Sequence, residues 1–231
     1  MSDNSSPTPT TTGSKKPSHE NALQDNQLAN EISDVKSMLR TITTQRELAA
    51  ALEPLGYDEE EIKAGTTLQV DADVKFAARQ EALAVAVQDK ARRDKADQAV
   101  TEEFSTYRQT VQACFKGADR AILGASGRIS EDIEAFDTLA HSAYKTALTE
   151  PYASVLAKKG FKPARIEAAL AALDELATIN TTSKASHKAA IAATKARDAA
   201  RKKMNDWAAG LRKIARANLR KRTDLVALLG A

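Results

Sequence analysis

Two long stretches of the chain contain neither glycine nor proline, the two residues that interrupt helices most strongly. The first runs from Thr66 to Lys116 and the second from Ala164 to Ala209. Both are rich in alanine, which is the strongest helix former. Each stretch is therefore predicted to form one very long α-helix, although an average helix has only about 11 residues. A helix over residues 59–116 would measure roughly 85 Å at about 1.5 Å per residue.

The composition points to the same fold class. Only 4% of the residues are aromatic and 28% are charged, and alanine supplies much of the apolar content. This mixture suits helices and gives a β-sheet little to pack, so the fold class is predicted as all-α. Because alanine buries little area per residue, the core is expected to be thin.

Both long helices follow a glycine and an aromatic residue, which are Gly56-Tyr57 and Gly160-Phe161. In the first helix, Asp58 is predicted as the N-cap, with Glu61 as its capping-box partner. The acidic run over residues 59–61 fits the first turn, because the helix macrodipole favours negative charge there.

Shorter helices are predicted around the long ones. Thr44 would cap a short helix over residues 45–53, with Glu47 as its capping-box partner. Ser130 would cap a further helix, and Pro151 would begin another short one. Before all of these, apolar residues at helical spacing indicate a first helix; they are Leu28, Ile32, Val35, Met38, Leu39 and Ile42.

The second half of the chain repeats the order of the first half: helix, short helix, glycine-aromatic pair, long helix. Matched residues are offset by 104 at the start of the long helices and by 100 near their end. The difference of four residues is about one helical turn, which keeps the apolar face aligned. The order and the matches predict a gene duplication. The matched pairs include Leu52 and Leu156, Gly56 and Gly160, Tyr57 and Phe161, Phe104 and Met204, Tyr107 and Trp207, and Arg120 and Arg220.

This organisation predicts two tandem helical repeats after an N-terminal tail. The tail over residues 1–21 is expected to be disordered, as a solvated segment or a flexible tether. The first repeat would span residues 22–124 and the second residues 125–231, both within one cooperative unit. The long helices would run antiparallel as a coiled-coil stem, residues 82–99 against 185–200, with a helical bundle at each end. A compact bundle in which the long helices bend or break is the alternative.

The sequence offers little for catalysis. It has no G-x-S-x-G, Walker A or H-E-x-x-H motif and no E-x-x-H pair of the di-iron kind. His141 is expected to make a surface contact with Asp137, His187 to lie on a solvated helix face, and Cys114 to be a small core residue. We therefore predict a protein that is not an enzyme, with no catalytic residues, metal, cofactor or small-molecule substrate.

The distribution of charge is the strongest functional signal. The chain has a net charge of +3, but residues 195–222 contain eleven basic and only two acidic residues. A basic helix neutralises phosphates or lies on an anionic membrane, and an acidic protein is a third partner that fits. Alternatively, these charges are solvated or pair within the protein, for example with the acidic run at 58–61. The predicted anion- or partner-binding residues are Arg201, Lys202, Lys203, Arg212, Lys213, Arg216, Arg220, Lys221 and Arg222.

Other apolar residues are predicted to pack inside the fold. Tyr107 and Trp207 lie on regular apolar stripes and are predicted as core residues. The apolar end over residues 225–229 would dock on its own bundle or on a neighbouring molecule. The sequence has no run of about 18 apolar residues and no secretory signal, so a cytoplasmic protein is expected.

The Gly56-Tyr57 start, the Ala-rich helix after it and the Leu229-Gly230 ending resemble tandem, Ala-rich, all-helical bacterial proteins of no assigned function. The resemblance covers about residues 52–231, and it implies neither an activity nor site residues. The function predicted is a structural or interaction (scaffold) protein with a protein partner or self-association. The alternative is a basic module that binds nucleic acid or an anionic membrane surface through residues 195–222.

Overall fold

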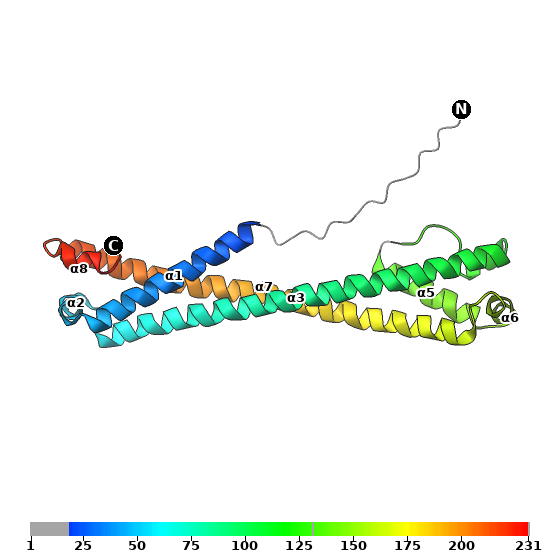
Figure 1. Ribbon diagram of the computed structural model, residues 1–231, viewed down its shortest axis with the longest axis horizontal. Helices are drawn as coiled ribbons and strands as arrows, with labels where there is room; N and C mark the ends of the chain where they lie inside the picture. Colours follow the sequence, from blue (N-terminus) through cyan, green and yellow to red (C-terminus); the bar gives the residue numbers. More distant parts are fainter. Residues whose placement is uncertain (1–18, 131, 231) are drawn as a thin grey trace, which may run out of the picture. The chain divides into compact units, whose positions relative to one another are not determined.

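The computed structural model describes residues 19–130 and 132–230 (Figure 1). The predicted tail therefore lies outside the described residues as far as residue 18, and helix α1 (His19–Thr44) follows directly. The described residues form helices and loops without a strand, which confirms the all-α class. After α1 come α2 (Arg46–Leu52), the short 3₁₀ helix η1 (Glu53–Leu55), α3 (Glu59–Cys114), α4 (Ala118–Ile122), α5 (Ile133–Ala147), α6 (Tyr152–Ala157), α7 (Pro163–Asn218) and α8 (Thr223–Ala227).

The two long helices are continuous, as predicted. α3 and α7 each contain 56 residues without a break. α7 even continues through Gly210, past the end predicted for it. Gly65 lies inside α3 because Trp207 packs against it: a Cβ atom at Gly65 would be only 2.2 Å from Cζ2 of the indole ring. Only glycine, which has no side chain, leaves enough space for the indole ring at this position of the helix.

The described chain divides into two compact units. Unit 1 combines the described residues up to 77 with those from 195 onward, and unit 2 consists of residues 78–194. In unit 1, Glu61 near the start of α3 accepts a 2.8 Å hydrogen bond from the indole of Trp207 near the end of α7. In unit 2, Glu103 near the end of α3 accepts two hydrogen bonds, of 2.7 and 2.9 Å, from Arg165 near the start of α7. The long helices are therefore antiparallel within each unit.

Unit 1 has an aliphatic core. The stripe predicted from Leu28 to Ile42 is buried on α1, and it packs with α2, α8 and the final turns of α7. The apolar end of the chain also contributes, because Leu225 and Leu229 are buried in this same core. The prediction that this end docks on its own bundle is therefore confirmed. From α7 the core receives Ala200, Met204, Ala208, Leu211 and Ala215.

Unit 2 has an aromatic core. The Tyr107 ring is fully buried, with ring centroids 4.8 Å from Tyr144 and 5.6 Å from Phe161. Phe104 stacks on Tyr107 and meets Phe136 edge to face. These rings come from α3, α5 and the turn before α7, so one cluster joins two helices of the unit to the segment that leads into the third. Aromatic rings bury large areas and gain from edge-to-face contacts, which makes this cluster the main packing element of unit 2.

The starts of three helices test the N-caps predicted from the sequence. Asp58 caps α3 as predicted, because its Oδ1 accepts a 2.9 Å hydrogen bond from the Glu61 N–H. The cap at Thr44 is wrong: its hydroxyl donates to carbonyls of α1, and Gln45 precedes α2 without a side-chain cap. The cap at Ser130 is also wrong, since Asp132 accepts from the Ala135 N–H and α5 begins at residue 133.

The prediction that Cys114 is a core residue is wrong as well, because its side chain is only half-buried at the end of α3. Over residues 82–99, the part of α3 predicted to form the stem, no side chain is fully buried. The thin packing expected for this stretch is therefore observed.

The turns before the two long helices have the same local structure. Gly56 and Gly160 both adopt a left-handed backbone, with φ of 88° and 93°. The N–H after each glycine donates to the carbonyl of a fully buried leucine, Leu52 at 3.2 Å and Leu156 at 3.0 Å. Each long helix is also followed by a five-residue helix, α4 after α3 and α8 after α7. Neither short helix was predicted from the sequence. The predicted gene duplication is compatible with these equivalences and stays a prediction.

Candidate functional site: the basic end of α7

The basic residues predicted as a binding surface come from the second half of α7 and the turn that leads to α8. They all belong to unit 1. The structure separates them into residues that pair with acidic side chains of the same unit and residues that do not. Only the second kind has its charge available to a partner.

Arg201 is the most firmly engaged member of the set. Its Nε and Nη2 donate to the two carboxylate oxygens of Glu31 on α1, at 2.8 and 2.5 Å. Asn205 donates to the same carboxylate at 2.8 Å. The hydrogen bond from Arg201 holds the pKa of Glu31 below its ordinary value, although partial burial opposes the shift. This bidentate pair ties α1 to α7, so its role is structural.

Lys202 and Arg222 are paired at the surface. Lys202 contacts Asp206 one turn further along α7, at 2.5 Å. Arg222 donates to Glu47 of α2 at 2.6 Å and to Asp224 at 2.9 Å. Exposed pairs of this kind contribute little to stability, but they occupy the cation. Lys203 and Lys221 are exposed.

Four cations near the end of α7 have a different environment, and we call them the basic ridge: Arg212, Lys213, Arg216 and Arg220. With Ala209 and Ala217 they line a surface hollow of about 420 Å³. Among the described residues, none of the four pairs with a carboxylate. Arg212 is held by its Nε, which donates to the carbonyl of Leu229 at 3.1 Å. Lys213, Arg216 and Arg220 are exposed at helical spacings of three and four residues.

The matched end of α3 shows that an arginine there need not point to solvent. Arg120 follows α3, and its Nε and Nη2 donate to the carbonyls of Phe115 and Gln112, at 2.6 and 2.5 Å. These are carbonyls of the last helical turns, which have no partner within the helix. Arg220, which the sequence matches to Arg120, makes no such bond to a described residue and lines the hollow.

The acidic partners of the paired cations were not found by sequence reasoning. The run at 58–61 was one partner suggested for these charges. Glu61 does meet α7, but it accepts a hydrogen bond from Trp207, while Asp58 caps α3. The partners that Arg201 and Arg222 find on other helices are Glu31 and Glu47. They lie more than 150 residues before the cations, and only the packing of α1 and α2 on α7 brings them near. In the sequence, Glu31 directly precedes Ile32, which belongs to the buried stripe of α1. This neighbour was the only indication that Glu31 could lie close to another helix.

The two histidines considered for catalysis have different surroundings. His141 lies between two carboxylates: its Nδ1 is 3.2 Å from Asp137 Oδ1 and its Nε2 is 3.2 Å from Asp174 Oδ1. The contact with Asp137 was predicted, whereas Asp174 comes from α7 and adds a link between α5 and α7. His187 is exposed, as expected. A search of the described residues found no group of three or more His, Cys, Asp or Glu side chains placed to hold a metal ion.

Comparison with known proteins adds no further constraint. Family models, curated proteins and solved structures were compared with the chain, and none of them matches it. The resemblance to bacterial tandem-helical proteins therefore stays a prediction. Among the described helices, none has the length and apolar character that crossing a membrane requires.

Proposed function

We propose that this chain is a non-enzymatic interaction (scaffold) protein that docks an acidic segment of a protein partner on the basic ridge. The observation that carries the proposal is the division of the basic residues. Arg201, Lys202 and Arg222 are neutralised within unit 1, whereas the ridge cations surround one hollow without a described acidic neighbour. Unpaired cations that gather on one surface create a local positive potential, which attracts a negatively charged partner.

The form of the surface favours carboxylate side chains of a protein. Three of the four ridge residues are arginines, whose planar guanidinium groups bind carboxylates in a bidentate manner. Ala209 and Ala217 add small apolar patches to the hollow, against which the aliphatic part of a glutamate side chain can pack. A folded α7 presents these groups at fixed spacing, so little ordering is required when the partner binds.

The test is binding of a fluorescein-labelled polyglutamate peptide to the full chain, followed by fluorescence anisotropy at low salt. The variant Lys213→Glu/Arg216→Glu/Arg220→Glu reverses the exposed ridge and leaves Arg212 in place, because Arg212 holds Leu229. We expect its affinity for the peptide to fall at least about tenfold. The matched control Lys158→Glu/Lys159→Glu/Lys162→Glu makes the same charge change at exposed positions of unit 2. An equal loss in the control, or no peptide binding to the unchanged chain, would overturn the proposal.

Nucleic acid or an anionic membrane surface is the second candidate. One observation favours it: three exposed cations follow one another at the end of α7 and in the turn after it, as contacts to successive phosphates can. The lining of the hollow contains no aromatic side chain, so stacking on single-stranded bases is unsupported. Tighter binding of a DNA duplex or of phosphatidylserine vesicles than of the peptide, lost in the ridge variant, would select this candidate.

The proposal includes the location and the origin of the protein. We propose that it is cytoplasmic and that its two repeats arose by gene duplication. On both α3 and α7, buried and half-buried positions recur at alternating steps of three and four residues, the spacing of a coiled-coil seam. Self-association is the other mode of interaction, and light scattering of the full chain at rising concentration measures it directly.

A further inference from the structure

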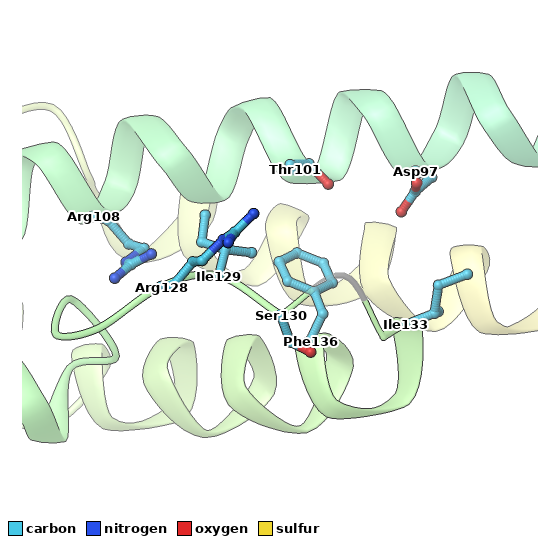
Figure 2. Close-up of a pocket in the computed structure, with 8 residues that line it drawn as sticks. All are labelled: Asp97, Thr101, Arg108, Arg128, Ile129, Ser130, Ile133 and Phe136. Carbon is cyan, nitrogen blue, oxygen red and sulfur yellow. The ribbon is translucent and has the colours of Figure 1, made fainter. Parts of the chain in front are cut away.

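A second candidate site lies in unit 2, apart from the basic ridge. A cavity of about 660 Å³ opens between α3, α5 and the loop that joins α4 to α5. Its volume is within the range of sites that hold small molecules. Figure 2 shows that α3 provides one wall, while the loop and the start of α5 provide the other. The residues that line it are Asp97, Thr101, Arg108, Arg128, Ile129, Ser130, Ile133 and Phe136.

Arg108 is the unusual member of this lining. Only 8% of its surface is exposed, although an arginine stays charged under all ordinary conditions. Its Nη2 donates to the carbonyl of Gly127 at 2.6 Å, but its buried Nε has no hydrogen-bond partner among the described residues. No carboxylate of a described residue pairs with it either. A buried cation in this state is costly, so an anion that enters the cavity would find a favourable partner.

The other side chains extend this environment. Figure 2 shows Arg128 reaching from the loop toward α3, into the same space that Arg108 borders. Thr101 supplies a hydroxyl from α3. Asp97 is eleven residues before Arg108 on α3, about 16 Å along the helix axis, so it does not neutralise that end of the cavity.

The remaining wall is apolar. Phe136 is almost completely buried, and Ile129 and Ile133 are half-buried beside it. The cavity therefore combines charged and hydroxyl side chains with an apolar patch of three residues, so it can hold a polar group and an apolar group of one ligand. The start of α5 offers no extra donor here, because Asp132 already caps it.

We propose that this cavity binds a small organic anion. Its carboxylate or phosphate group is held by Arg108, and its apolar body packs against Ile133 and Phe136. The inference is independent of the basic ridge, because every residue in the lining belongs to unit 2. It also differs from the expectation from the sequence, which predicted no small-molecule ligand.

The experiment is a titration of the isotope-labelled full chain, followed by NMR of its backbone amides. The probes are phenyl phosphate, benzoate, inorganic phosphate and neutral benzyl alcohol. We expect saturable shifts in residues 97–136 with phenyl phosphate or benzoate, and the stronger of the two identifies the anionic group. Inorganic phosphate lacks the apolar body and benzyl alcohol lacks the charge, so both should bind at least about tenfold more weakly.

Variants decide whether Arg108 is responsible. Arg108→Met should weaken binding of the better anion at least about tenfold, whereas Arg92→Met, an exposed arginine on the same helix, should leave it unchanged. If Arg108→Met does not fold, Thr101→Glu takes its place, because it adds a negative charge at a half-buried position of the lining and should weaken binding of the anion. The ridge variant with Lys213, Arg216 and Arg220 replaced should bind the anion normally.

Three results would overturn the proposal. The first is no saturable binding of phenyl phosphate, benzoate or inorganic phosphate tighter than about 1 mM. The second is equal binding of benzyl alcohol. The third is unchanged affinity in Arg108→Met, or in Thr101→Glu where that variant replaces it, because the charge of the lining would then have no influence on binding.

Discussion

Unit 1 and unit 2 use one arrangement of helices with two different kinds of core. At matched positions, Met204 in unit 1 and Phe104 in unit 2 are both fully buried. Tyr107 lies at the centre of an aromatic cluster, whereas its counterpart Trp207 is half-buried and meets Tyr57 edge to face, with ring centroids 6.1 Å apart. The arrangement therefore depends on where apolar volume is placed, more than on which side chain supplies it.

The same comparison holds for charge. After α3 in unit 2, Arg120 closes the helix by binding two of its carbonyls. At the matched end of α7 in unit 1, Arg220 lines the hollow of the basic ridge. One position thus serves the fold in unit 2 and faces the solvent in unit 1. A residue that stability does not require is one that binding can use, which is the basis of the function proposed above.

The largest expected effect comes from truncating the two matched core residues. Phe104→Ala should destabilise unit 2 by about 3–5 kcal/mol, because a large ring leaves a cavity among rigid aromatic neighbours. Met204→Ala should destabilise unit 1 by about 2–3 kcal/mol, toward the lower end of the range for such changes, since flexible aliphatic neighbours can partly fill the space.

Hydrogen exchange followed by mass spectrometry measures the exchange rate of each unit separately in each variant. We expect faster exchange in residues 78–194 for Phe104→Ala, and in the remaining described segments for Met204→Ala. Equal acceleration throughout both units would instead support the prediction, made from the sequence, of a single cooperative unit. Equal destabilisation by the two variants would show that the aromatic core of unit 2 is no more rigid than the aliphatic core of unit 1.

A second prediction concerns the close packing of Trp207 on Gly65. Gly65→Ala should destabilise unit 1 by about 1–3 kcal/mol, because the new Cβ would lie inside the contact distance of the indole ring. The matched pair in unit 2 is Ala169 and Tyr107, a larger residue with a smaller ring. Adding Trp207→Tyr to Gly65→Ala reproduces that pair and should restore most of the loss in urea unfolding followed by circular dichroism.

The helical glycine Gly210 is the matched control. A Cβ atom there would be 3.4 Å from the Tyr57 hydroxyl, so Gly210→Ala should be tolerated. Replacing a glycine inside a helix also gains up to about 1 kcal/mol in helix propensity. If Gly210→Ala and Gly65→Ala lose the same stability, the contact with Trp207 is not what preserves the glycine.

Much of this architecture could be predicted because its signals are local. The absence of helix breakers identified α3 and α7, and the Asp58 cap follows from a side chain three residues from its partner. The caps at Thr44 and Ser130 failed because several polar residues compete at each of those turns. Asp132, two residues beyond Ser130, is the one whose carboxylate meets the free N–H.

The candidate sites were harder to predict than the fold. Which cations are neutralised depends on Glu31 and Glu47, whose positions near α7 follow from packing and not from spacing. The cavity in unit 2 combines α3, a loop and α5, and its significance depends on the burial of Arg108. On the sequence, Arg108 is an ordinary basic residue beside Tyr107.

A third prediction sharpens the comparison of the matched arginines. Arg120→Ala should destabilise unit 2 by about 1–2 kcal/mol, because the carbonyls of Gln112 and Phe115 lose charged donors. Arg220→Ala should leave the stability of unit 1 within about 0.5 kcal/mol, as for most surface changes. Both variants are compared by urea unfolding. A loss at Arg220 as large as at Arg120 would show that Arg220 also serves the fold.

The smallest expected effect is a dependence on pH that arises in unit 1 from Glu31. Its pKa is lowered in the folded protein by the hydrogen bond from Arg201, so the unfolded chain takes up the proton first as the pH falls. The pair therefore contributes its full stability above the ordinary pKa, near 4.5, and loses it progressively below that pH. We expect a contribution of about 1 kcal/mol, because both side chains are partly exposed. Glu31→Gln keeps an acceptor for Arg201 but does not titrate, so the acid-dependent loss in urea unfolding should shrink in this variant. An unchanged pH profile would mean that other carboxylates govern the acid stability of unit 1.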